Sequence, residues 1–228
     1  MYHSQYIANK QNPHNITANL PLFVDDVNDN IDLSHILQFL QRKIPARFYQ
    51  TLKSVHIKHL REFEERKINA LFKNRTIYVS GFQENTEDIL RSIVHELGHV
   101  VEYKYHSTIY GDQKLEKEFL LKRKTFFDRI QEKALKNKKS LQLLLMNPEY
   151  STELDDFFYN FFGYDRLGRE YGDVFVSPYS ITSLSEYWGV GFETYFIDGK
   201  EKLVKISPVL FNKIEDVVYE RSENDREK

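Results

Sequence analysis

The feature that most constrains this chain is Ser92–Val101, an apolar segment that contains His95-Glu96-Leu97-Gly98-His99. In a helix, residues four apart share a face, so His95 and His99 can both point at one metal ion. Glu96 lies one step round the helix, where its carboxylate can reach a water molecule on that metal. The segment therefore predicts a buried helix that carries a metal site. The rest of the chain must supply a third ligand and a core.

This helix is expected to begin at a cap from Asn85 or Thr86, with Glu87 and Asp88 in its first turn. Apolar side chains cover most of its circumference, as is typical of a buried helix. They are Ile89, Leu90, Ile93, Val94, Leu97, Val100 and Val101. The polar residues of the motif interrupt this surface, a local conflict that is expected at functional sites. Gly98 has no side chain, so it is expected to let another backbone or the substrate strand pass closely. The alternative is a buried helix that carries two histidines by chance.

The chain has no cysteine, so a zinc site must use histidines and carboxylates. A catalytic zinc has three protein ligands and one water, whose pKa the metal lowers to about 7. A neighbouring glutamate can take the proton and pass it to a leaving amine. We therefore expect a zinc-dependent hydrolase in which Zn²⁺ lies on His95 and His99 and Glu96 is general base and acid.

The residues that follow the motif do not supply an obvious third ligand. A three-histidine metzincin site would need glycine and histidine where the chain has Glu102 and Tyr105. The Asn-Glu-x-x-x-Asp segment of thermolysin-type enzymes is also absent, since residues 115–118 read Leu-Glu-Lys-Glu. His106 is better explained as an exposed histidine at a helix end.

A second expected helix, Ser183–Phe196, offers two carboxylates seven residues apart, Glu186 and Glu193. Either can be the third ligand, because both lie on one face among aromatic residues. However, Ser183 and Glu186 also form a capping-box pattern, in which the glutamate pairs only with a backbone N–H. Glu193 can equally be a solvent-facing residue. The pattern alone leaves the choice open.

The segment Val94–His99, together with Tyr179 and Ser185-Glu186-Tyr187-Trp188, resembles the anthrax-lethal-factor-like zinc peptidases, which include the secreted Pro-Pro endopeptidases. These are gluzincins, whose third ligand is a glutamate that opens a helix of the form Glu-aromatic-aromatic-small. The resemblance implies that Glu186 is the third ligand. It also implies that Tyr179, seven residues earlier, stabilises the oxyanion. The chain departs from the family in its long segment between His99 and Glu186, and in Val190, where the family has a second glutamate.

The predicted fold class is α+β: a mainly helical, zincin-like domain with a small N-terminal sheet. Strands are expected over Leu20–Val24, Ser54–Leu60, Ile68–Phe72 and Thr76–Ser80. The last two are expected to form a hairpin, because the polar residues Lys73-Asn74-Arg75 between them suit a turn. Besides the two helices above, helices are expected over Asp32–Arg42, Leu115–Lys136, Lys138–Met146, Thr152–Phe162 and Pro208–Tyr219. We expect an extended arm over residues 1–30, one domain over 31–220 and a charged tail over 221–228.

On the substrate side, Thr76–Ser80 is predicted to be an edge strand to which a peptide adds as a further strand. The Gly- and Tyr-rich segment Tyr164–Ser180 is predicted to be a loop that can act as a lid. The expected activity is hydrolysis of peptide bonds in a peptide or protein substrate. The alternatives are an antirepressor-type zinc protease of a phage or mobile element, to which His-Glu-Leu-Gly-His is also similar, and a non-catalytic binding module.

Composition and charge limit the classes of binding partner that are expected for this protein. The net charge of -2 gives no reason to expect nucleic acid as a partner. No apolar run is long enough to span a membrane, and residues 1–6 do not resemble a signal peptide. A cytoplasmic protein is expected, with a secreted mature form as the alternative. The oligomeric state is not predicted.

Overall fold

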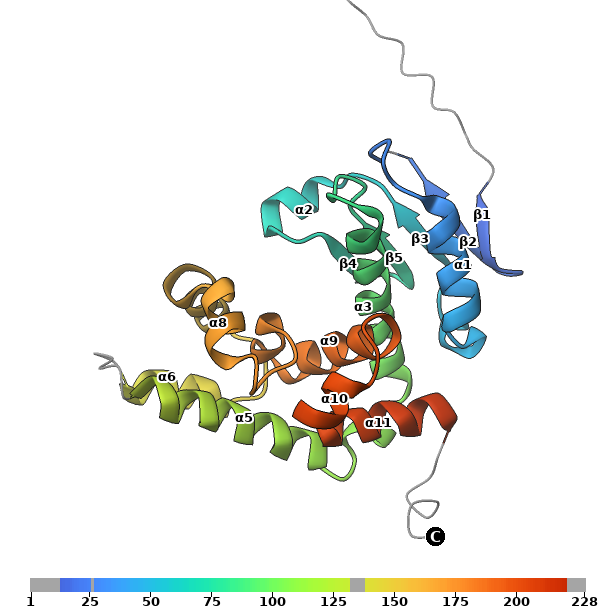
Figure 1. Ribbon diagram of the computed structural model, residues 1–228. Coiled ribbons are helices and arrows are strands. Elements are labelled where there is room, and N and C mark those ends of the chain that lie inside the picture. The colour runs from blue at the N-terminus through green and yellow to red at the C-terminus, as the bar shows by residue number, and fades with distance from the viewer. Residues whose placement is uncertain (1–12, 26, 132–137, 221–228) are drawn as a thin grey trace, which may run out of the picture. The chain divides into compact units, whose positions relative to one another are not determined.

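The computed structural model describes residues 13–25, 27–131 and 138–220, which form a mixed α+β structure dominated by helices (Figure 1). A small five-stranded sheet lies in the N-terminal part, so the predicted fold class is confirmed at this level. The chain divides into two compact units, residues 1–93 and 94–228. The division falls inside α3 (Thr86–Lys104). None of the described helices is long and apolar enough to cross a membrane.

The first unit is a sheet with the strand order β1-β2-β3-β5-β4. The central pairs, β2 with β3 and β3 with β5, are parallel, and the two outer pairs are antiparallel. Leu22, Val55 and Ile77 lie in register across the three central strands and are fully buried. Helix α1 packs beside β1 and contributes buried apolar residues to this core (Figure 1). The elements are β1 (His14–Thr17), β2 (Leu20–Val24), α1 (Leu33–Lys43), the 3-10 helix η1 (Ala46–Tyr49), β3 (Ser54–Ile57), α2 (Arg61–Arg66), β4 (Ala70–Lys73) and β5 (Thr76–Val79).

Two expectations for this unit are wrong. The strand expected over Leu20–Val24 is confirmed as β2, but the residues before it are not only an extended arm, because His14–Thr17 form the further strand β1. The predicted hairpin does form, with Asn74 and Arg75 at positive φ in its turn. Its second strand, β5, is not an edge strand, because it pairs with β3 on one side and with β4 on the other. The edge strands of this sheet are β4 and, on the opposite side, β1.

The second unit consists of helices around an aromatic core. Phe126 on α5 packs against the rings of Phe158, Phe162 and Tyr171, with centroid distances of 5.6, 5.4 and 4.8 Å. The elements after α3 are α4 (His106–Tyr110), α5 (Lys114–Gln131), α6 (Lys138–Met146), α7 (Thr152–Asp156), the π-helix η2 (Phe157–Phe162), α8 (Tyr164–Tyr171), the 3-10 helix η3 (Pro178–Ile181), α9 (Leu184–Ile197), α10 (Glu201–Ile206) and α11 (Pro208–Tyr219).

The helix predictions over 138–146, 152–162 and 208–219 are confirmed. The predicted loop Tyr164–Ser180 is wrong, because its first half forms α8. Leu167 and Tyr171 on α8 are buried and anchor it to the core, which outweighs the weak helix propensity of its glycine. The expected tail over 221–228, and the end of the helix expected to reach Lys136, lie outside the described residues.

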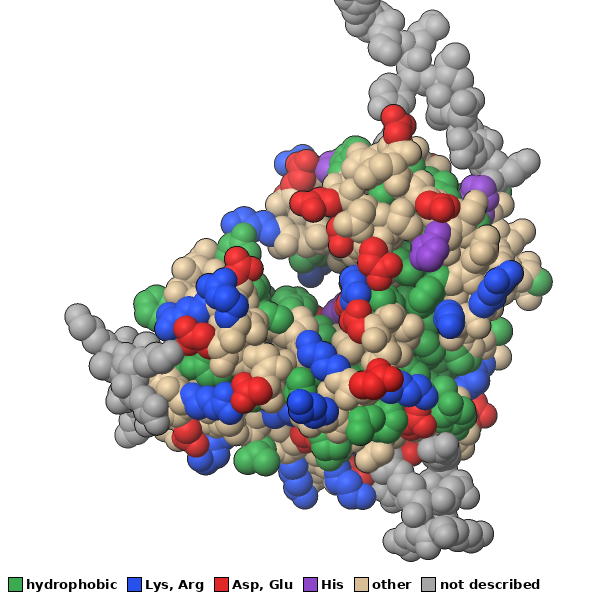
Figure 2. Space-filling view, viewed as in Figure 1, with side chains coloured by type: hydrophobic (Ala, Val, Ile, Leu, Met, Phe, Trp, Pro, Cys, Tyr) green, Lys and Arg blue, Asp and Glu red, His purple; other side chains and the backbone are tan. Residues whose placement is uncertain are grey.

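Acidic and basic side chains are interspersed over the helices of the second unit on the face shown in Figure 2. Several of them form ion pairs one helical turn apart, such as Lys124 with Asp128 and Arg166 with Glu170. Such exposed pairs contribute only about 0.3–0.5 kcal/mol each. The stability of this unit therefore depends on its interior.

One interior side chain, Arg123 on α5, is fully buried and has carbonyl oxygens as its partners. Its guanidinium donates hydrogen bonds to the carbonyls of Leu145 and Asn147 at the end of α6. It also donates to Ile181 at 2.9 Å and to Thr182 at 2.7 Å, just before α9. A planar fork of five N–H groups suits this arrangement of acceptors. Arg123 thus fixes the segment that connects η3 to α9.

Replacing Arg123 by methionine is expected to lower the free energy of unfolding by about 3–5 kcal/mol, because buried carbonyls lose their donors. Chemical denaturation followed by circular dichroism measures this change. The matched control is Lys124→Met, the exposed neighbour, which is expected to change stability by less than about 1 kcal/mol. Equal stabilities of the two variants would contradict the assigned role of Arg123.

Candidate metal centre

Helix α3 forms as the sequence predicts. Asn85 is the cap, since its side-chain oxygen accepts a hydrogen bond of 3.0 Å from the N–H of Asp88. The apolar residues predicted to be buried are all buried. His95, Glu96 and His99 are each only partly exposed, and they form the polar interruption of this helix. The C-terminal part of α3, from Val94 onward, belongs to the second unit.

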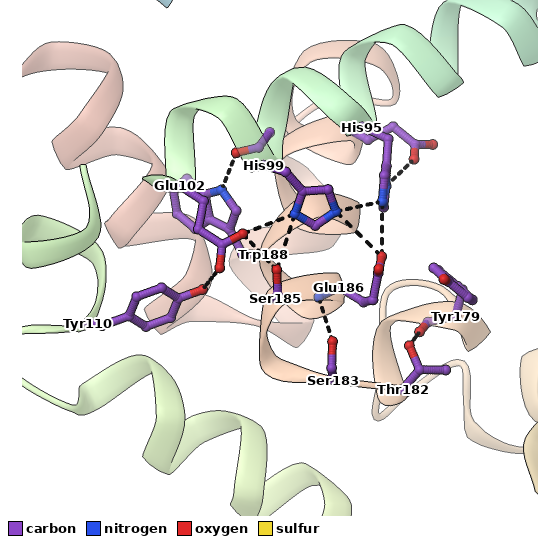
Figure 3. A network of polar contacts seen from close by, with 12 residues as sticks. His95, His99, Glu102, Tyr110, Tyr179, Thr182, Ser183, Ser185, Glu186 and Trp188 are labelled. Carbon is purple, nitrogen blue, oxygen red and sulfur yellow. Dashed lines mark hydrogen bonds and ion pairs between the residues drawn. The ribbon is translucent and has the colours of Figure 1, made fainter. Parts of the chain in front are cut away.

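Helix α9 begins at Ser183, whose hydroxyl accepts a hydrogen bond of 3.0 Å from the N–H of Glu186. The serine half of the predicted capping box is therefore present. The carboxylate of Glu186, however, faces the two histidines, with one oxygen 3.0 Å from His95 Nε2 and 3.7 Å from His99 Nε2 (Figure 3). Glu186 thus contributes its backbone to the cap and its side chain to the candidate site.

Two glycines let α3 and α9 approach closely. A Cβ atom on Gly98 would lie 3.3 Å from the Cα of Gly189, and one on Gly189 would lie 3.0 Å from the imidazoles of His95 and His99. The fully buried Trp188 closes the contact, because its indole N–H donates a hydrogen bond of 2.9 Å to the carbonyl of Gly98. The predicted role of Gly98, to let another backbone pass closely, is confirmed.

The close contact assembles a group that can hold a metal ion: His95, His99 and Glu186, with one donor atom of each within 4.8 Å of the others. The two Nε2 atoms are 3.2 Å apart. Glu193, the other candidate ligand, is not part of this group. One of its carboxylate oxygens lies 3.5 Å from Nδ1 of His95, the nitrogen that faces away from the group. His106 is exposed at the start of α4 and is not part of this group.

No protein-family model matches this chain, and no curated protein or solved structure is significantly similar to it. The geometry of the three donor atoms is therefore the independent support for the metal site. The resemblance to the lethal-factor-like peptidases still depends on the residues of the two helices and on Tyr179.

The Nδ1 atom of His99 contacts a polar network that was not predicted from the sequence (Figure 3). One carboxylate oxygen of Glu102 lies 3.0 Å from His99 Nδ1, and the hydroxyl of Ser185 lies 3.2 Å from the same nitrogen. Ser185 also donates to Glu102 at 2.8 Å, and Tyr110 donates to its other oxygen at 2.6 Å. Glu102 thus orients the imidazole so that its Nε2 faces the group.

A sequence signal for Glu102 existed. Residues three apart in a helix are neighbours, so the carboxylate of Glu102 can reach the imidazole of His99. The metzincin pattern has glycine at this position, so comparison with that pattern does not indicate a role for Glu102. Nothing local indicates Tyr110, because its contact with Glu102 follows from the turn between α3 and α4. Glu193, which the sequence offers as an alternative third ligand, contacts His95 Nδ1 and is not one of the three grouped residues.

The charges of the site shift its pKa values in opposite directions. Burial by itself lowers the pKa of both imidazoles, but Glu186 and Glu193 raise that of His95 to about 9. Glu102 and Glu186 likewise raise the pKa of His99 to about 10. Burial raises the pKa of Glu186, but the histidines outweigh it and hold the pKa well below its usual range. Without a metal, the group therefore binds at least one proton at neutral pH, which an incoming cation must displace.

Glu96 and Tyr179 are electrostatically coupled to the group. The charge of Glu96 acts on both His99 and Tyr179. The ring of Tyr179 lies 6.3 Å from that of His95, between centroids, and 38% of the residue is exposed. Burial and then the charge of Glu186 raise the pKa of the phenol, so it remains protonated and can donate a hydrogen bond at neutral pH.

Replacing Glu102 by alanine is expected to weaken metal binding about 10–100-fold, because His99 loses the carboxylate that orients it. Competition with a chromophoric chelator measures the affinity, with Zn²⁺ as the probe, and circular dichroism checks folding. Glu87→Ala, an exposed substitution at the start of the same helix, is the control and should leave the affinity unchanged. A folded Glu102→Ala protein of wild-type affinity would exclude this positioning role.

Proposed function

We propose that this protein is a zinc-dependent metalloendopeptidase of the gluzincin type, in which His95, His99 and Glu186 hold the metal. The observation that carries the proposal is the convergence of these three donor atoms beside Glu96. Ligand atoms about 2.0 Å from a tetrahedral zinc ion lie about 3.3 Å apart. The separations of 3.2, 3.0 and 3.7 Å within the group are close to this value.

Two imidazole nitrogens and one carboxylate are a donor set of catalytic zinc, which leaves one position for water or substrate. Zinc, when bound, lowers the pKa of a coordinated water and polarises a carbonyl group. The chain lacks cysteine, which other zinc sites use. Glu102 and Glu193 support this assignment, since ligating histidines commonly donate their second N–H to a carboxylate.

Glu96 is the proposed general base and acid. Its carboxylate takes a proton from the attacking water and delivers it to the nitrogen of the leaving amine, so that the peptide C–N bond breaks. The phenol of Tyr179 is proposed to donate a hydrogen bond to the substrate oxygen as negative charge develops there. Oxyanion donors of this kind contribute about 3–4 kcal/mol. Protonated Tyr179 suits this role, as its raised pKa keeps the proton in place.

The test measures zinc content and the cleavage of a peptide library by wild type, Glu96→Gln and Glu186→Ala. Loss of cleavage with zinc retained in the first variant, and loss of zinc in the second, would support the proposal. Full proteolysis by Glu96→Gln would overturn the mechanism. A wild-type protein purified without zinc, and unable to bind it, would instead favour a non-catalytic binding module.

A further inference from the structure

A cavity of about 400 Å³ lies in the second unit, beside the start of α9. We name it the Glu102 pocket. Its volume is in the range of pockets that bind small ligands, so it has room for a long side chain. Its lining includes Glu102, Tyr110, Glu116, Glu149, Tyr150 and Ser185. Glu149 and Tyr150 are exposed and form part of its rim, whereas Glu102, Tyr110 and Ser185 are only partly exposed.

The Glu102 pocket adjoins the candidate metal centre. Glu102 and Ser185, which line it, are also the two residues that contact His99 Nδ1. Ser183 and Leu184 line it as well and precede Glu186 on the chain. The pocket is therefore on the Nδ1 side of His99, one imidazole ring away from the donor atoms.

The charge of the pocket is negative. Glu102, Glu116 and Glu149 line it, whereas no lysine or arginine of the described chain does. Glu102 is already bonded to His99, Ser185 and Tyr110. In contrast, the carboxylates of Glu116 and Glu149 have no hydrogen bond or ion pair with any other described residue. His106 also lines the pocket, at its exposed rim, where its ring lies 5.0 Å from that of Tyr110.

The walls between these carboxylates are apolar. Pro148, Leu184 and the rings of Tyr110 and Tyr150 complete the lining. An occupant that suits both parts has a long aliphatic stem and a cationic end, as lysine and arginine do. Low-dielectric walls around unpaired carboxylates strengthen the attraction of such a cation. The pocket thus offers a basic side chain both apolar contacts for its stem and negative charge for its end.

We propose that the Glu102 pocket receives a lysine or arginine side chain of the peptide substrate and so selects basic sequences. This inference rests on the proposed peptidase function for its substrate, and on the cavity itself for its chemistry. Glu116 and Glu149 are the residues that distinguish a basic side chain from a neutral one of the same length.

Binding tests this proposal without depending on cleavage. The probes are acetylated and amidated alanine pentapeptides with lysine, arginine, norleucine or glutamate at the centre, bound to the zinc-loaded Glu96→Gln protein. We expect the lysine and arginine peptides to bind about tenfold more tightly than the norleucine peptide. The double variant Glu116→Gln/Glu149→Gln should lose this preference. The control Glu153→Gln/Glu201→Gln, which changes two exposed glutamates outside the lining, should keep it.

The outcomes separate this proposal from the peptidase function. A basic preference that disappears only in the Glu116/Glu149 double variant supports the pocket, even if wild type cleaves no peptide of the library. Equal binding of the norleucine and lysine peptides overturns the pocket, even if wild type is an active peptidase. A preference that persists in the double variant also overturns it, since other residues would then supply the charge.

Discussion

Replacing Glu96 by glutamine is expected to lower the rate of peptide cleavage about 1,000-fold while zinc stays bound. The amide cannot take a proton from the attacking water, and general acid–base catalysis of this kind contributes about 10²–10⁴-fold. Zinc should remain because Glu96 is not among the three residues whose donor atoms converge. The shape of the side chain is kept, so the fold of α3 should not change.

Cleavage of the best peptide from a library, with zinc measured by elemental analysis, checks this expectation. Glu87→Gln is the control, since Glu87 lies at the start of the same helix and pairs there with Arg91. It should retain both activity and zinc. Loss of zinc in Glu96→Gln would make Glu96 a ligand, and undiminished cleavage would show that another residue carries the proton.

The first helix of the site was predictable because its signals are local. An asparagine cap, acidic residues in the first turn and an apolar circumference are all contained in residues 85–104. The four-residue spacing then fixes the relative directions of His95 and His99. The close approach of α9 was only suggested by Gly98, because no local pattern says which helix fills the space that a glycine leaves.

Local sequence patterns do not predict the direction of the Glu186 carboxylate. Its capping-box spacing describes the backbone correctly, since Ser183 does cap α9. The direction of the carboxylate depends on the packing of α3 against α9 through Gly98, Gly189 and Trp188. That packing joins residues about 90 positions apart in the chain. Only the family resemblance favoured Glu186 over Glu193, and the contacts of Glu186 with the histidines are consistent with it.

The predictions of an edge strand at Thr76–Ser80 and of a loop at Tyr164–Ser180 also failed because of contacts between distant parts of the chain. The hairpin β4–β5 was predicted correctly from its turn. The order of the strands, however, depends on the whole sheet. Strand β3 pairs with the side of β5 that was expected to be free. In Tyr164–Ser180, the glycines and tyrosines suggested a loop. Burial of Leu167 and Tyr171 against the aromatic core nevertheless stabilises α8. Tertiary contacts decided both cases.

Replacing Glu186 by alanine is expected to weaken zinc binding about 100-fold or more, whereas Glu193→Ala should weaken it less. Zinc binding to small sites of four ligands releases about 10–16 kcal/mol, so loss of one ligand costs about 3 kcal/mol, or roughly 100-fold in affinity or more. Glu193 contacts His95 on its other nitrogen, and loss of such a partner costs about 10–100-fold. The two residues are seven apart on α9, which makes them a matched pair.

Zinc affinity by chelator competition and peptide cleavage at saturating zinc distinguish the two carboxylates. Excess zinc should restore most of the activity of Glu193→Ala, because its three donor atoms are intact. It should not restore Glu186→Ala, whose site lacks one of them. If Glu193→Ala lost zinc more completely than Glu186→Ala, the ligand assignment would be reversed. Glu186 would then be only an ion-pair partner of the histidines.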